Sequence, residues 1–529
     1  MNTIFLFAFL SFLSLSTSTL AQVQFTQRLE VETEWSDDDF FVLPRENGMV
    51  AFRMKSETSY GSKNIFQYVV GDFQLRADSP RQIKLDGFYE LEGFDLDEDL
   101  LYVLFNKGSQ YDSEKAIFEI NLENQTMQEL ELNSILEMEL QDFLVFNKHA
   151  VFMGKYDYRP VIQIFDILSK EVITVPGLFE KDAKILQMRK DPELNVFDVV
   201  ISSRDFYKKK IVSIVTFDTK GNKLREVKID DLGDPSMEIV EGLLTSSHQY
   251  KQALIGPYGL RKKEAYQGLY FTKINEFGEY ENKFYTVSDF ENFFNYLPDK
   301  ARERKLRRVE RNLNRGKQIP IRNVVVTREI NASDGYYLVY NDHFISSSSR
   351  YIPRDGMYAS NFYRLNPMMG GYGGLYNPLW IDPRFRSSQV SNQYKYLAAQ
   401  FILFDEEGNI IWDNTLNLDN DSKTRPVKYG EISFNGRNLF YMYLDEEMLM
   451  LSQIKDGEVV IENEPFELEL IDENERIADT KESTLQLLWW YDDYYLLSGK
   501  QRIRYQGEDG QAKSREVNFF TKIKVDDFI

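Results

Sequence analysis

The sequence predicts an all-β protein, and three observations carry this prediction. Short runs that alternate apolar and polar residues recur along most of the chain, and turn residues join them in pairs. Aromatic residues make up 14% of the chain, and the Phe and Tyr residues within these runs favour strands over helices. The last run, 518–527, nearly repeats an earlier one, 269–276.

The two similar runs continue differently. After 269–276 the chain turns at Gly278 and enters another strand-like run, 281–287, whereas after 518–527 the sequence stops. A repeat unit that is one strand short needs that strand from elsewhere, because an open ring of sheets leaves an unpaired edge. We therefore expect residues 24–32, near the start of the mature chain, to supply the missing outer strand.

The outer half of each unit is a strand, a turn and a second strand. Gly and Asn at these turns adopt positive φ at little steric cost, and Asp bonds its own backbone there. The clearest pairs are 117–121 with 127–132, 162–166 with 172–175, 214–218 with 224–229, 401–405 with 410–418, and 451–454 with the run from 459 onward.

A nearly continuous apolar run precedes each outer pair, which indicates a strand buried on both faces between neighbouring sheets. Where no insertion intervenes, these runs recur roughly every 50 residues, near the upper end of known repeat lengths. They are 49–52, 101–105, 150–153, 196–201, 253–255, 336–340, 439–444 and 494–497.

Four strands per unit, this repeat length and closure by a shared strand together resemble the β-propeller architecture. We predict one domain, 22–529, with eight blades; seven is the alternative if the weak pair at 235–257 is irregular. No WD dipeptide, Kelch double glycine or Asp-box pattern recurs, so the resemblance extends to no narrower family.

Residues 1–21 are predicted to be a signal peptide, with an apolar core from Ile4 to Leu15 and small residues before Gln22. The sequence has no cysteine, which is typical of an exported bacterial protein in the periplasm or on the outer surface and excludes thiol chemistry. No later segment is apolar enough to cross a membrane. A net charge of -21 argues against binding of nucleic acid.

A first insertion, 288–321, is predicted to be helical and basic. Ser288 and Glu291 form a capping-box pattern, Pro298 suits the first turn of a second helix and Gly316 suits its end. The second helix carries a thin apolar stripe of Ala301, Leu306, Val309 and Leu313. Its basic residues are Lys300, Arg302, Arg304, Lys305, Arg307, Arg308, Arg311, Arg315 and Lys317.

Two interpretations of this helix stay open. In the first, Arg304, Arg307, Arg308 and Arg311 bind an acidic partner, which is a protein face, lipid headgroups or an anionic polysaccharide. In the second, the apolar stripe packs on the ring of the same chain and the charges are merely solvated.

A second insertion, 346–392, is rich in Gly, Tyr, Pro and Arg and has neither helical nor strand periodicity. Long loops of this kind are functional or disordered. Tyr372, Tyr376 and Trp380 are predicted to contact a partner; alternatively the loop folds over one mouth of the ring or stays disordered.

Chemistry-bearing motifs are few. The three histidines, His149, His248 and His343, have no metal-ligand spacing, and no nucleophile elbow or phosphate-binding loop is present. The acid clusters 37–39, 95–99, 445–447 and 492–493 are interpreted as solvated turns. The doublet Trp489-Trp490 is expected to place one ring in the core and the other outward.

The sequence therefore predicts an exported, non-catalytic propeller that acts as an interaction scaffold, with no cofactor and no metal. The alternative is a carbohydrate-binding or carbohydrate-active propeller whose site lies at the axial mouth, and a third interpretation is a structural role in the cell envelope. Because propellers host both enzymes and binders, the fold alone does not decide between these functions.

Overall fold

The computed structural model describes residues 22–526 except 57–62, 88, 110–111, 133–134, 179–182, 247–250, 261–265, 318, 322, 334, 347–392, 419–421, 424–426 and 508–509. The predicted signal peptide lies outside these residues.

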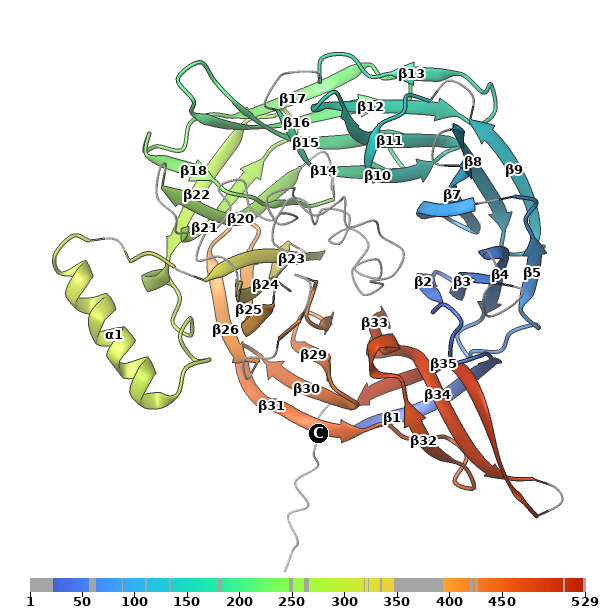
Figure 1. Ribbon diagram of the computed structural model, residues 1–529. Coiled ribbons are helices and arrows are strands. Elements are labelled where there is room, and N and C mark those ends of the chain that lie inside the picture. The colour runs from blue at the N-terminus through green and yellow to red at the C-terminus, as the bar shows by residue number, and fades with distance from the viewer. Residues whose placement is uncertain are drawn as a thin grey trace, which may run out of the picture.

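The described strands form eight antiparallel sheets arranged in a ring (Figure 1), which makes the chain an eight-bladed β-propeller. The strands of blades one to four are β2 (Phe41–Arg45), β3 (Gly48–Ser56), β4 (Lys63–Gly71) and β5 (Arg81–Lys84); β6 (Tyr89–Asp97), β7 (Leu100–Ser109), β8 (Asp112–Asn121) and β9 (Thr126–Leu132); β10 (Glu139–Phe146), β11 (His149–Tyr156), β12 (Arg159–Asp166) and β13 (Val172–Thr174); and β14 (Lys184–Asp191), β15 (Val196–Arg204), β16 (Lys210–Asp218) and β17 (Lys223–Ile229).

Blades five to eight have the same plan, and in blades five to seven the strand nearest the axis comes first along the chain (Figure 1). Their strands are β18 (Met237–Ile239), β19 (Leu243–Leu244), β20 (Gln252–Leu260), β21 (Tyr266–Ile274) and β22 (Tyr280–Thr286); β23 (Val324–Ser333), β24 (Tyr336–Ser346), β25 (Tyr394–Asp405), β26 (Ile410–Asn417) and β27 (Ser422–Lys423); β28 (Glu431–Phe434), β29 (Asn438–Asp445), β30 (Met448–Lys455) and β31 (Glu458–Glu467); and β32 (Arg476–Thr480), β33 (Gln486–Tyr491), β34 (Tyr494–Gln506) and β35 (Ala512–Asp526).

Strand β1 (Gln22–Glu32) completes blade eight as its outermost strand. It pairs antiparallel with β35 along its length, from Gln22 opposite Asp526 to Glu32 opposite Val517, with one irregularity between Phe25 and Gln27. The predicted closure by the N-terminal strand is therefore confirmed, and the unpaired edge of β35 is covered.

All eight predicted apolar runs fall in the second strand of a blade, where most side chains on both faces are buried. In blade one, for example, Met49, Val50, Ala51 and Phe52 of β3 are fully buried. The Phe52 ring lies 5.0 Å from that of Phe94 in the next blade, so the core is made between blades rather than within them.

The weak pair at 235–257 belongs to a true blade with an interrupted inner strand. β18 and β19 both pair with β20 but are separated by Val240, Glu241 and Gly242. The interruption explains why the pattern is poor there, since neither piece is long enough to show alternation. Seven blades, the alternative count, is excluded.

Candidate partner-binding site

The first insertion leaves the ring after β22 of blade five and returns to it at the edge of blade six from which the second insertion starts. Val324, at the start of β23, pairs with Phe344 near the end of β24. Ser346, the last residue of β24, pairs with Tyr394 at the start of β25. The segment that returns from the first insertion thus meets blade six where the second insertion begins and ends. Tyr372, Tyr376 and Trp380 lie outside the described residues.

The base of the first insertion is capped two residues earlier than predicted. Thr286 and Asp289 form the capping box, with the Thr286 amide donating to the Asp289 carboxylate at 2.6 Å. The helix so capped is one 3-10 turn, Val287–Asp289. The prediction of a helix starting from Ser288 with Glu291 as its partner was wrong, because the Glu291 amide instead donates to Asp413 of β26 at 2.9 Å.

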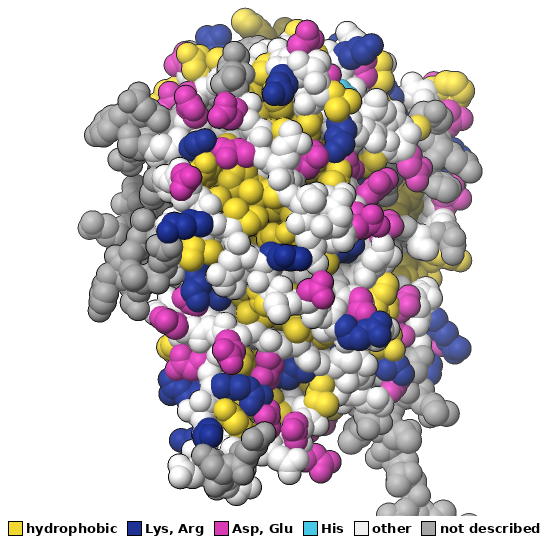
Figure 2. Space-filling view, turned by 90° about the vertical axis from the view of Figure 1, so that its right-hand side faces the viewer, with side chains coloured by type: hydrophobic (Ala, Val, Ile, Leu, Met, Phe, Trp, Pro, Cys, Tyr) yellow, Lys and Arg dark blue, Asp and Glu magenta, His cyan; other side chains and the backbone are white. Residues whose placement is uncertain are grey.

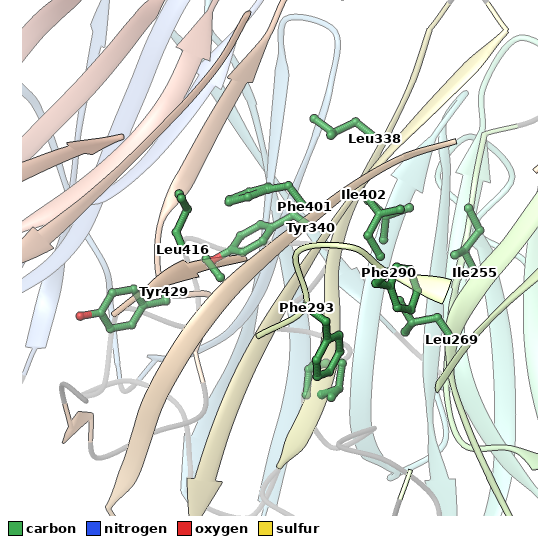
Figure 3. Packing of buried hydrophobic residues seen from close by; sticks show 14 of the residues in the cluster. Ile255, Leu269, Phe290, Phe293, Leu338, Tyr340, Phe401, Ile402, Leu416 and Tyr429 are labelled. Carbon is green, nitrogen blue, oxygen red and sulfur yellow. The ribbon is translucent and has the colours of Figure 1, made fainter. Parts of the chain in front are cut away.

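Three phenylalanines after this turn fix the insertion to the ring. Phe290, Phe293 and Phe294 are buried in the core that joins blades five, six and seven (Figure 3). The Phe293 ring lies 5.4 Å from that of His343 on β24. The insertion therefore starts from a rigid base.

Helix α1 (Asp299–Leu313) comes next along the chain, and it stands outside the ring (Figure 1). Pro298 precedes its first turn, and Gly316, with φ of 62°, ends it as predicted. Val309 is the buried member of the predicted apolar stripe, whereas Leu306 and Leu313 are 46% and 49% exposed. The stripe as a whole therefore does not pack on the ring.

Five of the exposed cations of α1 gather on one side of the helix. At about 100° per residue, Lys300, Arg304, Arg307, Arg308 and Arg311 fall on a single side, which we call the arginine face. All five side chains are exposed. The four arginines predicted to bind a partner are thus brought together.

Only one arginine of this face has an ion pair within the described part of the chain. Arg307 contacts Glu303 at 3.2 Å on the same helix. The Nε atoms of Arg304 and Arg311 donate to backbone carbonyls one turn earlier, at 2.9 and 3.1 Å. The ring supplies no carboxylate to Arg304, Arg308 or Arg311 among the described residues, so these guanidinium groups keep donors for an external acceptor.

A second candidate site is a cavity of about 210 Å³ on the inner strands β28 and β33, between blades seven and eight. Tyr429 and Tyr443 contribute rings whose centroids are 5.0 Å apart. Gln486 also lines the cavity, and its carbonyl Oε1 is buried without a hydrogen-bond partner within the described residues.

Lys428 and two glutamates place charge beside this cavity. The Lys428 ammonium lies 2.8 Å from Glu329 and 2.7 Å from Glu431. Burial alone would lower the pKa of Lys428, but the two carboxylates outweigh it and raise the pKa. Burial raises the pKa of Glu431, against the effect of Lys428. The three groups connect blades six and seven.

The interpretation of the acid clusters as solvated turns was wrong for two of them. Asp95 of β6 binds Lys190 of β14 at 2.6 Å across the intervening blade. Asp37 and Asp39 bind cations of blades one and eight. Sequence reasoning missed these pairs because their members are far apart in the chain and meet only when the ring closes.

Asp142 of β10 is a fully buried acid that the sequence did not single out. Its Oδ1 accepts from the Phe143 amide at 2.9 Å, and its Oδ2 has no partner within the described residues. Burial raises the pKa of Asp142 to about 7, and the nearby Asp95 carboxylate adds to the shift. The protonation state of Asp142 therefore affects the free energy of unfolding of the ring.

The two histidines that the structure describes do not converge. His149 begins β11 in blade three and His343 lies on β24 in blade six, two blades that are not neighbours, and His248 is outside the described residues. His343 is fully buried beside Gln400, and burial lowers its pKa to about 4, so it is a neutral core residue at physiological pH.

The doublet Trp489-Trp490 divides as predicted. Trp490 is 5% exposed and donates from its indole to the Gly48 carbonyl at 2.8 Å, whereas Trp489 is 39% exposed. Among the described residues, no helix has the length and apolarity needed to cross a bilayer.

Comparisons with known proteins find only distant similarity. No family model matches the chain, and no curated protein matches it. Among solved structures, the chain is similar to the β-propeller domain of the trilobed protease from Pyrococcus furiosus, with a TM-score of 0.35, 11% identity, and coverage of 80% of this chain and 95% of that one.

Two further similarities are to enzymes. The polysaccharide lyase Uly1 has a TM-score of 0.38 and 8% identity, and the match covers 95% of this chain and all of the other. The acylaminoacyl peptidase from Pyrococcus horikoshii has a TM-score of 0.33 and 10% identity, and the match covers 81% of this chain and 52% of that one. At such identities the similarity concerns the fold alone.

Proposed function

We propose that the chain is an exported, non-catalytic propeller that acts as a scaffold in a bacterial envelope and binds an acidic partner protein through the arginine face of α1. One observation carries the proposal: Arg304, Arg308 and Arg311 are exposed on one side of a helix that stands off an acidic ring, without an ion pair in the described residues. Arginine forms bidentate pairs with carboxylates, with two parallel hydrogen bonds, and this suits binding to an acidic protein surface.

The apolar content of α1 favours a protein over a lipid surface. A helix that inserts into a membrane interface needs a broad apolar face. Here Val309 is already buried, which leaves Leu306 and Leu313 as the exposed apolar residues of the helix. Two isolated leucines give little area for insertion. Tyr372, Tyr376 and Trp380, from the second insertion, are proposed as further partner contacts.

Affinity capture with matched variants tests this proposal. The test variant carries Arg304→Glu, Arg307→Glu, Arg308→Glu and Arg311→Glu. The control variant carries Arg159→Glu, Lys220→Glu, Lys223→Glu and Lys228→Glu, four exposed cations of blades three and four, and has the same net charge.

The expected partner is an acidic envelope protein that wild type and the control retain, that salt releases, and that the test variant does not retain. A version lacking 350–386 measures the contribution of the second insertion. Retention of the same proteins by the test variant would contradict the proposal.

A second candidate function is binding of a sugar or another hydroxylated ligand in the cavity between blades seven and eight. The unpaired Oε1 of Gln486 favours it, because a buried acceptor gains a hydrogen bond when a ligand hydroxyl enters. Calorimetric titration with a panel of saccharides tests it. We expect at least one saccharide to bind weakly. Its affinity should fall in Gln486→Leu and stay unchanged in the α1 test variant. Absence of heat with every saccharide would reject this candidate.

A further inference from the structure

A second cavity lies under helix α1, between the helix and the segments that anchor it to the ring. Its volume is about 110 Å³. The apolar part of its lining consists chiefly of Phe293, Phe294, Val309 and Ile321, which are all buried. The phenylalanines and Ile321 belong to the rigid base of the insertion, so the cavity has fixed walls on the ring side.

The rim of this cavity is basic and polar. Lys305 and Arg308 of α1 contribute to it, and within the described residues neither has an ion pair. Asn323, on the opposite side, donates to the Tyr296 hydroxyl at 3.4 Å. In protein interfaces, one anchor side chain is often buried in an apolar pocket with charged residues around it. The apolar floor of this cavity and the two exposed cations beside it have the same arrangement.

The size of the cavity limits what enters. An engineered cavity of about 150 Å³ holds benzene. A volume of 110 Å³ is smaller, so it suits an aliphatic side chain such as leucine better than an aromatic ring. A sugar ring is at least as large as benzene, so the same limit on volume argues against a saccharide as the occupant.

We propose that this cavity receives one aliphatic side chain from an acidic segment of the partner protein, while Lys305 and Arg308 bind carboxylates on either side of it. The inference rests on the proposed scaffold function and specifies what α1 recognises: an acidic stretch with a single aliphatic anchor. Electrostatic attraction favours the encounter of the acidic segment with the helix. The cavity then determines which residue of the segment is placed beneath α1.

Fluorescence polarisation with short labelled peptides tests the inference on the whole chain. One peptide consists of glutamates with a central leucine, and two others replace that leucine by alanine or phenylalanine. We expect wild type to bind the leucine peptide about tenfold more tightly than the alanine peptide, with the phenylalanine peptide in between, because its ring exceeds the cavity.

Two variants place the anchor. Val309→Trp fills the cavity from the helix side and is expected to bind the leucine and alanine peptides equally. Leu306→Trp is the matched control, since Leu306 is exposed on the same helix and does not line the cavity; it is expected to keep the tenfold preference. The comparison of peptides on wild type needs no substitution in the protein, so misfolding of Val309→Trp leaves the test intact.

The outcomes separate the two proposals. Equal binding of all three peptides, lost in the four-arginine variant, overturns the aliphatic anchor and leaves the scaffold function standing. Absence of binding of every peptide at millimolar concentration overturns the anchor as well, and the capture experiment then judges the scaffold function by itself. A preference for leucine that survives in Val309→Trp also contradicts the inference, because the anchor would then bind elsewhere.

Discussion

The seam where the ring closes and the helix α1 use their cations in opposite ways. At the seam, Arg53 of β3 is fully buried and donates to Gln67 at 2.7 Å and to Thr33 at 2.8 Å, with Asp37 at 3.4 Å. Lys500 of β34 is equally buried and pairs with Asp39 at 2.9 Å. Both cations bind the segment that leads from β1 into blade one, so they hold the first blade to the last.

The outer side of the seam is also paired. Arg515 of β35 binds Glu30 of β1 at 2.7 Å and Glu475 at 2.6 Å. The Arg28 guanidinium lies 4.4 Å from the Phe519 ring centroid and pairs with Glu30. Elsewhere on the ring, the side that carries β5 and β9 mixes basic and acidic side chains over its surface (Figure 2).

The arginine face has no such partners from the ring among the described residues. This difference separates the charges that hold the fold from those available to another molecule. Removing one member of a buried pair leaves an uncompensated charge and costs stability, whereas an exposed unpaired cation is solvated and its removal costs little. The contrast between seam and helix predicts effects on stability that differ widely in size.

Deletion of residues 22–34 is expected to destabilise the whole ring by several kcal/mol. It removes the pairing of β1 with β35, at about 1 kcal/mol net for each backbone hydrogen bond, and exposes an edge strand. Calorimetric melting measures the loss, and addition of a peptide spanning 22–34 should restore the transition. Replacement of 299–317 by a Gly-Ser linker is the control, and it should cost much less, about 1–2 kcal/mol, because Val309 is the buried apolar side chain that it removes. A deletion variant that melts like wild type would contradict the closure.

Substitution of one buried seam cation is expected to cost more than the same change on α1. Arg53→Met removes a buried guanidinium from Gln67, Thr33 and Asp37, and the expected loss is about 3 kcal/mol. The carboxylates are not left unpaired, because Asp37 keeps Lys55 and Asp39 keeps Lys500. Arg308→Met, on the arginine face, should stay within about 0.5 kcal/mol of wild type. Urea unfolding of both variants at neutral pH gives the two values. Similar losses would remove the distinction between the two regions.

Asp142 is expected to make the ring less stable as pH rises. The unfolded carboxyl ionises near pH 3.9, whereas burial raises the pKa of the folded group to about 7. Between these values the folded chain binds the extra proton, so stability falls with increasing pH by up to about 1.4 kcal/mol per pH unit. Asp142→Asn lacks this slope.

Unfolding of wild type and Asp142→Asn across pH 4–8 measures the slope as a difference between the two proteins. The free energy of unfolding of the variant, relative to that of wild type, should rise with pH up to about pH 7. Above pH 7 the difference between the two proteins should stay constant. A difference that does not vary with pH would show that Asp142 is ionised throughout.

The smallest change in stability is expected for the four reversals on the arginine face. Arg304, Arg307, Arg308 and Arg311 make their side-chain contacts within α1, so their replacement by Glu removes no contact with the ring among the described residues. Melting should shift no more than in the control variant of blades three and four. A clearly larger loss would mean that the arginine face helps to hold the ring.

The fold was predictable because its signals are local. Second strands such as 49–52 and 439–444 are apolar throughout since neighbouring blades cover both faces. The likeness of 518–525 to 269–276 also reflects equivalent positions, because β35 and β21 are the third strands of their blades. Local pattern was therefore enough for blade count and closure.

The site was predictable only in part, because its key features depend on distant contacts. The charges of α1 and its end at Gly316 are visible in the sequence. The pairing of Lys500 with Asp39, the bond from Glu291 to Asp413 and the cavity beneath Val309 require the placement of segments that sequence pattern does not relate. The true cap, Thr286 with Asp289, fits the same box pattern but lies in the preceding strand, where helix signals were not sought.

The most direct test of the account is the salt dependence of binding to the labelled leucine peptide. Wild type and the control variant should bind it with an affinity that falls steeply as salt is raised, because several exposed arginines form the contact. The variant with Arg304, Arg307, Arg308 and Arg311 changed to Glu should not bind at any salt concentration. Equal affinity and equal salt dependence of wild type and this variant would contradict the claim that the unpaired cations of α1 are the partner-binding site.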